Sequence, residues 1–205
     1  MLRTILSLVA MSLLIASPAL ADDSKKSSDF AHYSVNGGIS PFGGSINVGY
    51  NSSEKTSWLF GFGGAPAILE LDMEIDGTDY TVGGSSAWTG FFVNHRPFDN
   101  AMWFRFVAGV GIGNIENELD DGNGNVYRVD YNENPVGYWG IGFGNEAKKG
   151  FLIGFDIGLL FTAGPDQIRV VEGAAPSQDH AKAIEDFWLF GNVLPNFQLT
   201  MGYGF

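Results

Sequence analysis

The chain has 205 residues, no cysteine and a formal net charge of −12 at pH 7. This length predicts one domain, the lack of cysteine excludes disulfides, zinc–thiolate sites and cysteine nucleophiles, and the excess of negative charge disfavours nucleic-acid binding. The 29 glycines and 14% aromatic residues are typical of a β-barrel, in which glycines relieve crowding and aromatic side chains face the lipid and its interfaces.

Residues 1–21 have the features of a secretory signal peptide. Arg3 supplies the positive start, Ile5 to Ala16 supplies an apolar segment, and Ala19-Leu20-Ala21 is a small-x-small cleavage site. The alternative is a transmembrane anchor, but the apolar segment is shorter than the roughly 18 residues that a spanning helix needs. We therefore expect export, removal of the signal peptide and a short periplasmic leader over residues 22–29.

From Phe30 onward, segments of alternating polar and apolar residues are separated by turn sequences. A period of two predicts strands with two unlike faces, and we expect about eight of them, with Gly37-Gly38 interrupting the first. Residues 87–95 are apolar on both faces, so their direction stays open. His32 and Trp103 are expected to face inward. The expected outward residues include Ala31, Tyr33, Val35, Ile46, Val48, Tyr50, Trp58, Phe60, Phe62, Phe104, Phe106, Trp139, Ile141, Phe143, Phe151, Ile153, Phe155, Ile157 and Leu159.

The connections between these segments alternate in length. Outer-membrane barrels have short periplasmic turns, long external loops and even strand numbers. Short turns are expected near Asn51, Arg96 and Asn145, and they carry Lys55, Lys148 and Lys149. The longer connections are an acidic hairpin or loop over 70–80, a polar loop over 114–134 and a segment over 163–192 that contains a helix between Ser177 and Phe190. This helix is expected to pack on the barrel rim, with a lid over the barrel mouth as the alternative.

The last predicted strand, Pro195 to Phe205, has the length of about ten residues that crosses a bilayer at a barrel tilt. Tyr203 and the terminal Phe205 resemble the assembly signal that the barrel-insertion machinery recognises. The predicted fold is all-β, a closed antiparallel transmembrane β-barrel of about eight strands over residues 30–205. A soluble β-sandwich also alternates, but it would not direct Phe and Trp outward on nearly every strand.

The inward positions predict a polar network in the lumen. Arg105 and Asp156 are its only clear charges, and we expect them to meet because a buried charge must be paired. A charged constriction that selects solutes is the alternative, although side chains can fill an eight-stranded barrel completely. The predicted network consists of Asn47, Asn94, Arg105, Asp156 and Gln198.

No catalytic, cofactor or specific metal site is expected. A hydrolase would need a serine beside a histidine base and an acidic residue, and none of His32, His95 and His180 has a serine nearby on its strand face. Residues 121–125 imitate the start of a calcium loop, but Val126 replaces the required glycine and Asn132 replaces the glutamate. Ordinary turn chemistry is therefore expected there.

Three motifs together resemble a group of small proteobacterial outer-membrane barrel proteins of unassigned function. They are Asn94-His95-Arg96-Pro97-Phe98 followed by Phe104-Arg105, then Gly154-Phe155-Asp156-Ile157-Gly158, and finally Pro195 with Gly202-Tyr203-Gly204-Phe205. Asn94 departs from the group, which tends to carry Asp there, and this leaves Asp156 as the expected partner of Arg105. More distantly, the layout is similar to the OmpA-like and OmpW-like barrels.

These patterns predict an integral protein of the bacterial outer membrane that is surrounded by lipid and lipopolysaccharide. The expected role is structural or in interaction at the envelope, with limited passage of small molecules. The alternatives are a narrow channel for small hydrophobic molecules, which the resemblance to OmpW-like barrels implies, and a lipid-modifying enzyme. The acidic segments 70–79 and 116–121 suggest weak association with divalent cations, unless their charges only keep the loops solvated.

Overall fold

The computed structural model describes residues 29–66, 70–131, 135–165, 168–188 and 190–205. The predicted signal peptide, leader residues 22–28 and Asn132 of the calcium-loop comparison lie outside the described residues. Among the described residues, no helix has the length and apolar character to cross a membrane.

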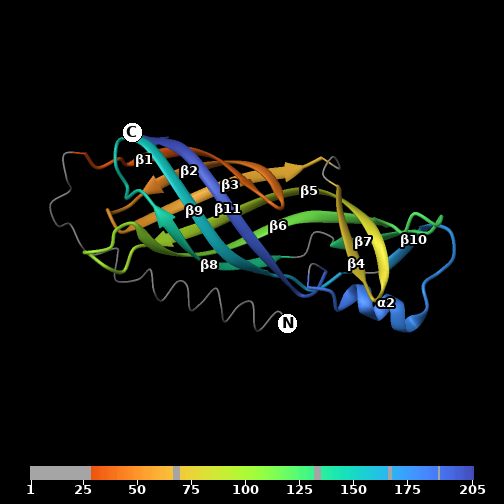
Figure 1. Cartoon of the computed structure of the whole chain (residues 1–205). Helices are drawn as coiled ribbons and strands as arrows, with labels where there is room; N and C mark the ends of the chain where they lie inside the picture. Colours follow the sequence, from red (N-terminus) through yellow and green to blue (C-terminus); the bar gives the residue numbers. More distant parts are fainter. Residues whose placement is uncertain (1–28, 67–69, 132–134, 166–167, 189) are drawn as a thin grey trace.

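A closed ring of eight antiparallel strands forms the barrel, as the sequence predicts (Figure 1). Each strand pairs with its neighbours in the ring, and β1 closes the ring against β11. The ring consists of β1 (Tyr33–Ser40), β2 (Gly43–Asn51), β3 (Thr56–Ala65), β5 (Thr78–His95), β6 (Phe104–Asp120), β8 (Val136–Gly144), β9 (Gly150–Phe161) and β11 (Val193–Gly204).

The predicted alternation of faces holds along most of the ring. On β2, Ile46 and Val48 are exposed on the outside while Asn47 is buried inside, and β9 alternates in the same way around Asp156. The direction that the sequence left open on β5 is resolved, because Asn94 lines the lumen and Phe91 is exposed. The apolar residues of this outer face suit a hydrocarbon environment, and the polar residues suit an enclosed lumen.

Four expectations are wrong: the directions of Ala31, His32 and Trp103, and the break at Gly37-Gly38. Ala31 is buried and His32 is exposed. The Ala31 N–H donates to the Ala147 carbonyl, and this bond holds the segment before β1 against the turn between β8 and β9. Strand β1 continues through Gly37-Gly38, since β2 and β11 pair with it on both sides. Trp103 is 58% exposed and stacks on Phe143. It precedes β6, so the alternation of that strand does not fix its direction.

Phe205 extends the seam between β1 and β11 by one residue pair. The Phe205 N–H donates to the Tyr33 carbonyl at 2.9 Å, and the Tyr33 N–H donates to the Phe205 carbonyl at 3.0 Å. The two rings stack with their centroids 6.3 Å apart. Phe205 therefore adds two hydrogen bonds and a ring contact at the end of the ladder between β1 and β11.

Deletion of Phe205 is expected to reduce the folded protein in the outer membrane, because the seam loses both hydrogen bonds and the expected assembly signal loses its terminal residue. The amount of heat-modifiable protein on unboiled gels measures this effect. Phe98→Ala is a matched control, since Phe98 is also exposed but lies in a short turn. Equal amounts of folded protein in the deletion variant and the wild type would contradict the role of Phe205.

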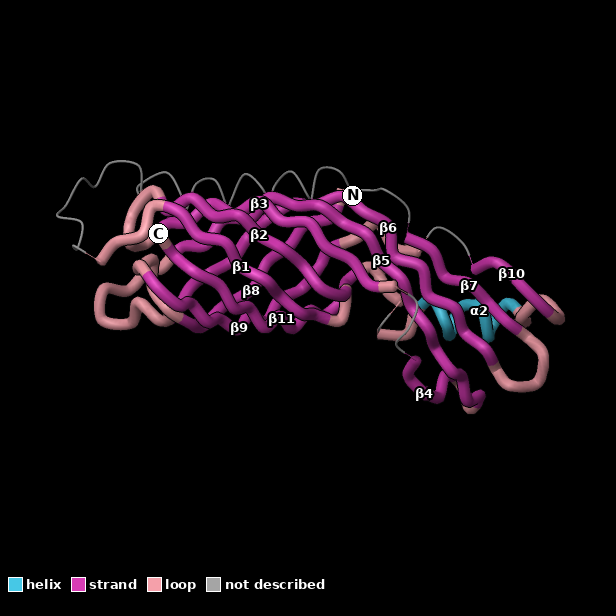
Figure 2. The backbone as a smooth tube through the Cα atoms, turned by 90° about the horizontal axis from the view of Figure 1, so that it is seen from above, coloured by secondary structure: helices cyan, strands magenta, loops and turns pink. Residues whose placement is uncertain are grey.

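The predicted loops at the other end of the barrel form a second folded layer instead. Strands β5 and β6 run for 18 and 17 residues, well beyond the roughly ten that cross a bilayer. Their distal halves pair with β4 (Glu70–Ile75) and β7 (Val126–Tyr131), and β10 (Ile168–Glu172) pairs with β7. We call these distal strands, together with helix α2 (Gln178–Glu185), the extension (Figure 2).

The extension has its own hydrophobic core. Acidic residues are frequent in β4 and in the distal half of β6, but alternate positions on several strands carry apolar side chains that the structure buries, as at Tyr80 and Val82 of β5. Leu160 and Phe42 connect this core to the mouth of the barrel. Its buried members are Ile75, Tyr80, Val82, Leu119, Tyr127, Val129, Tyr131, Ile184, Phe190 and Leu194.

Helix α2 begins where the sequence predicts and ends earlier. The Ser177 side chain accepts a hydrogen bond from the His180 N–H, which caps the first turn. Ile184 and Phe190 enter the core of the extension, whereas Trp188 is 61% exposed. The helix therefore packs against the strands of the extension, beyond the barrel (Figures 1 and 2).

Three tyrosines of the extension hold the long connection between β9 and β11. The Tyr80 hydroxyl hydrogen-bonds with His180 Nε2 at 2.6 Å, the Tyr127 hydroxyl donates to the Ala174 carbonyl at 3.2 Å, and the Tyr131 hydroxyl donates to the Gly191 carbonyl at 3.3 Å. Burial raises the pKa of Tyr80 to about 12, with smaller effects from Tyr127 and Asp121, and burial also raises the pKa of Tyr127 and Tyr131.

Alkaline pH is therefore expected to loosen the extension. A phenol whose pKa is raised by folding stabilises the fold fully below its unfolded pKa of about 10, and this contribution is lost as the pH rises through the folded value of about 12 for Tyr80. Hydrogen exchange of α2 should accelerate over this range together with the rise in tyrosinate absorbance. Tyr80→Phe should reduce the acceleration, and Tyr50→Phe on the barrel exterior should not. Exchange that is independent of pH, once corrected for the intrinsic rate, would contradict the role of the tyrosines.

Candidate functional site

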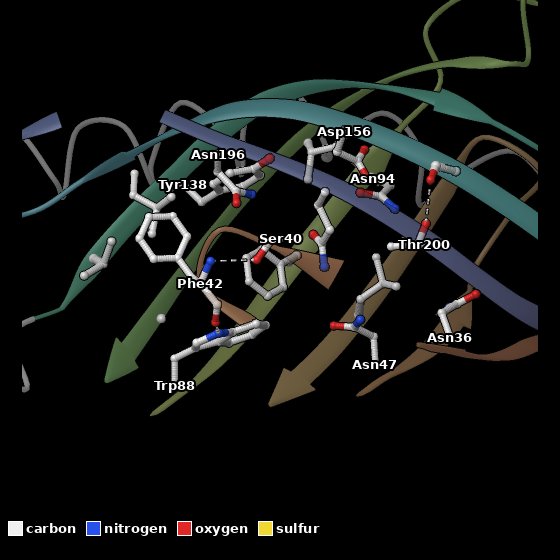
Figure 3. Close-up of a pocket in the computed structure, with 18 of the residues that line it drawn as sticks. Asn36, Ser40, Phe42, Asn47, Trp88, Asn94, Tyr138, Asp156, Asn196 and Thr200 are labelled. Atoms are coloured by element: carbon white, nitrogen blue, oxygen red, sulfur yellow. Dashed lines mark hydrogen bonds between the residues drawn. The ribbon is translucent and has the colours of Figure 1, made fainter. Parts of the chain in front are cut away.

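A cavity of about 190 Å³ follows the inside of the barrel and is lined by residues from all eight strands of the ring (Figure 3). Toward the extension its wall is aromatic: the rings of Trp88 and Phe92 lie 6.3 Å apart, and those of Phe92 and Tyr138 lie 5.9 Å apart. The Trp88 Nε1–H donates to the Phe42 carbonyl at 3.3 Å, which holds the β1–β2 turn beside this cluster. Toward the short turns the wall is polar.

The two predicted lumen charges form a buried, bidentate ion pair. Arg105 Nε donates to Asp156 Oδ1 at 3.1 Å, and Arg105 Nη2 donates to Asp156 Oδ2 at 2.8 Å. The pair requires a glycine opposite it, because a Cβ at Gly142 would overlap Asp156 Oδ1 and come within 2.6 Å of Arg105 Nε. Arg105 on β6 and Asp156 on β9 both pair with Gly142 of β8, so the ion pair joins β6 to β9 over this glycine, along one side of the lumen. A buried charge pair costs desolvation and is retained only with good geometry.

The remaining residues of the predicted network do not form one connected set. Asn47 and Gln198 both donate to the Ser45 hydroxyl, at 3.3 and 3.2 Å. Asn94 lines the cavity, but its side chain forms no hydrogen bond with any described residue. The predicted site is thus a shared surface with two separate bonded groups, Arg105 with Asp156 and Asn47 with Gln198.

Arg96 lines the lumen, although the sequence predicts it in a turn. Its Nε donates to the Met102 carbonyl at 3.1 Å, and its Nη2 donates to the Asn145 carbonyl at 2.8 Å. The residue is only 5% exposed, and its Nη1 has no hydrogen-bond partner among the described residues. A signal was present, because Arg96 lies two residues after Asn94 and so continues its inward face.

The histidines have neighbours that do not form a serine-based catalytic group. His95 Nδ1 lies 3.1 Å from Thr56 Oγ1, and His180 contacts Tyr80 and, at 3.5 Å, Asp76. Over the described ranges, no serine hydroxyl bonds to a histidine ring, and no group of three or more His, Asp or Glu side chains is placed to hold a metal ion.

The turn that imitates a calcium loop is closed by its own side chain. Asp121 accepts hydrogen bonds from the Asn125 side chain at 2.7 Å and from the backbone N–H groups of Asn123 and Asn125 at 2.8 and 3.0 Å. These bonds lower the pKa of Asp121, and the bond from the Asn125 side chain has the largest effect. Turn chemistry therefore accounts for this sequence.

A closed ring of eight antiparallel strands with an apolar exterior and a polar interior is the fold of outer-membrane β-barrel proteins. Two solved structures of such proteins are similar to the chain. CarO of Acinetobacter baumannii has a TM-score of 0.63 at 12% identity, covering 85% of this chain and 98% of CarO. CarO2 of the same organism has a TM-score of 0.67 at 12% identity, covering 87% of this chain and all of CarO2.

This likeness establishes the fold and confirms the distant structural similarity to eight-stranded outer-membrane barrels that the sequence indicated. No protein-family model matches the sequence, and no curated protein matches it significantly.

Proposed function

We propose that the protein is an integral outer-membrane barrel without enzymatic activity, and that its role at the envelope is structural or in interaction, through the extension. The short turns then face the periplasm, and the extension lies outside the membrane beside lipopolysaccharide. This orientation is supported by the lengths of the connections: the three at one end of the ring are short turns, and three of the four at the other end are long, the exception being the turn between β1 and β2.

The observation that carries the proposal is the hydrophobic core of the extension. A membrane anchor needs strands of only about ten residues, so the added strands, helix and buried side chains serve something besides anchoring. Loops without a task do not require a core of their own. Large apolar side chains are exposed at this end of the molecule, among them Leu71 on β4, which is 63% exposed, and Trp188 just after α2. An interaction role predicts that such side chains contact a partner or lipid.

Limited passage of small molecules is the second candidate, and the lumen cavity favours it. Against it, side chains can fill a barrel of eight strands, and the Arg105–Asp156 pair occupies part of the lumen over Gly142. Single-channel conductance of the purified protein in planar bilayers separates the two candidates. A structural or interaction role predicts no discrete conductance steps, whereas passage of solutes predicts steps that change in Asp156→Asn.

The positive test uses complementation. A strain that lacks the protein is compared with strains that carry either the full chain or a barrel in which short turns replace the extension, and permeability of the outer membrane to a hydrophobic dye is the readout. Only the full chain should restore the barrier that deletion weakens. Complete restoration by the shortened barrel would contradict a role of the extension.

A further inference from the structure

The extension is an open sheet, so it has two edges. Its strand order is β4-β5-β6-β7-β10, and within the described part of the chain β4 and β10 each pair with one neighbour only (Figure 2). The edge at β10 is irregular, because its register shifts between Val170 and Glu172, and a bulge of this kind hinders further pairing. The edge at β4 is regular over all six residues, Glu70–Ile75. Of the two edges, β4 is therefore the one that can accept another strand in register.

The turn between β4 and β5 determines which backbone groups of β4 face this edge. Its two residues have φ values of 51° and 75°, which are typical of a type I′ hairpin turn closed by a hydrogen-bonded pair, here Ile75 with Thr78. Bonded and non-bonded pairs alternate from there, so Met73 directs its backbone N–H and C=O groups toward β5. Asp72 and Glu74 direct theirs to the outer edge, where no described residue bonds to them.

The polar face of the extension carries only negative charge beside this edge. Glu74 lies directly opposite Asp79, and like charges in this arrangement destabilise an antiparallel pair. Neither carboxylate forms an ion pair with a described residue, and the same holds for Glu70 and Asp72. The arginines of this face lie on β7 and β10, where they pair with other acidic residues. The β4 edge is therefore complementary to a cationic partner.

The other face of β4 is apolar and only partly covered. Ile75 is buried in the core of the extension and Met73 packs against this core, but Leu71 is 63% exposed. A strand added beside β4 would place the side chains of one face beside Leu71 and those of the other face beside Asp72 and Glu74. The edge thus fits a segment in which basic and apolar residues alternate.

We propose that the outer edge of β4 binds an extended segment of a partner protein in which basic and apolar residues alternate. The segment adds to the sheet as a further strand. Its backbone bonds to the N–H and C=O groups of Asp72 and Glu74, and its basic side chains pair with their carboxylates. In strand addition the backbone bonds supply affinity and the side chains supply specificity. This inference rests on the interaction role proposed for the extension and specifies the chemistry of the partner.

The experiment measures binding of a fluorescent peptide to the purified full-length protein in micelles by anisotropy. The peptide has capped ends, alternating lysine and valine, and the six-residue length of β4. A second peptide has the same composition with its lysines in one block, so it keeps the charge and loses the alternation. Asp72→Ala removes a carboxylate and keeps the outward N–H, whereas Asp72→Pro removes both. Proline is tolerated there, because an outward N–H at an edge does not bond to the neighbouring strand. Glu172→Gln, on the β10 edge, is the matched loss of one charge.

Saturable binding of the alternating peptide is expected in the wild type and in Glu172→Gln. Asp72→Ala should lower the affinity by about two- to fivefold, the effect of one exposed ion pair. Asp72→Pro should lower it by about tenfold more, because the edge loses a hydrogen bond. Hydrogen exchange of the wild type needs no variant: the amides of Asp72 and Glu74 should exchange more slowly with the peptide bound, and that of Met73 should not change.

No saturable binding of the alternating peptide would overturn the site. Equal affinity for the two peptides, or equal affinity of Asp72→Ala and Asp72→Pro, would show attraction by charge alone and overturn strand addition. Unchanged exchange at Asp72 and Glu74 in wild-type protein saturated with peptide would overturn it as well, even if Asp72→Pro does not fold. These outcomes leave the role of the extension standing, because the complementation experiment tests that role without the peptide.

Discussion

Arg105→Ala is expected to lower the free energy of unfolding of the barrel by about 3–5 kcal/mol. The Arg105 and Asp156 side chains are 7% and 9% exposed and share two hydrogen bonds. Removal of the guanidinium leaves the Asp156 carboxylate buried without its partner, and this uncompensated charge, rather than the lost attraction, accounts for most of the effect. Urea unfolding in micelles, followed by tryptophan fluorescence, measures the change.

The matched control is Arg128→Ala, which breaks the 3.0 Å ion pair with Glu118 on the surface of the extension. An exposed pair contributes only about 0–1 kcal/mol, so this variant should unfold close to the wild type. The double variant Arg105→Met, Asp156→Leu removes both charges and should recover much of the loss. Equal destabilisation by Arg105→Ala and Arg128→Ala would contradict a structural ion pair in the lumen.

Leu119→Ala is expected to destabilise the extension by about 2–5 kcal/mol, the cost of a cavity in a packed core. Leu119 is fully buried on the distal half of β6, between the strands of the extension. Because the extension has its own core, the effect should be local. Hydrogen exchange should accelerate in β4, β7 and α2, while the heat-modifiable shift of the barrel stays unchanged.

Leu71→Ala provides the control on the same layer, because this leucine of β4 is exposed and its truncation removes little buried surface. Its exchange rates should match those of the wild type. If Leu119→Ala unfolded the barrel and the extension together, the two layers would form one cooperative unit, and the proposal of a separately stabilised extension would be wrong.

The barrel was predictable from the sequence because membrane strands obey a strict rule. Residues such as Ile46 and Phe155 face lipid, Asn47 and Asp156 face the lumen, and the period of two in the sequence therefore appears directly in the structure. The ion pair could also be predicted, since an inward strand position offers a buried charge few partners. At strand ends the rule fails, as Ala31 and Trp103 show, because turn geometry decides the direction there.

The extension could not be predicted from the composition of its segments. The many acidic residues between Glu70 and Asp121 indicate solvated loops, but apolar side chains at alternate positions form a core on one face while the acids occupy the other. The position of Arg96 in the lumen was not predicted, because Pro97 after it indicates a turn. The strand pairing nevertheless continues through the Arg96 N–H. In both places the period of two carried more information than the residue types.

The most direct test of the account is the accessibility of each barrel end on intact cells. Cysteines are placed at Asn123, in an exposed turn of the extension, and at Lys149, in an exposed short turn. Both positions avoid Gly77 and Gly122, whose positive φ values of 75° and 67° disfavour a side chain. A membrane-impermeant maleimide should label the Asn123→Cys variant on intact cells and the Lys149→Cys variant only after the outer membrane is opened. Labelling of Lys149→Cys alone on intact cells would invert the orientation and contradict an extension that acts outside the membrane.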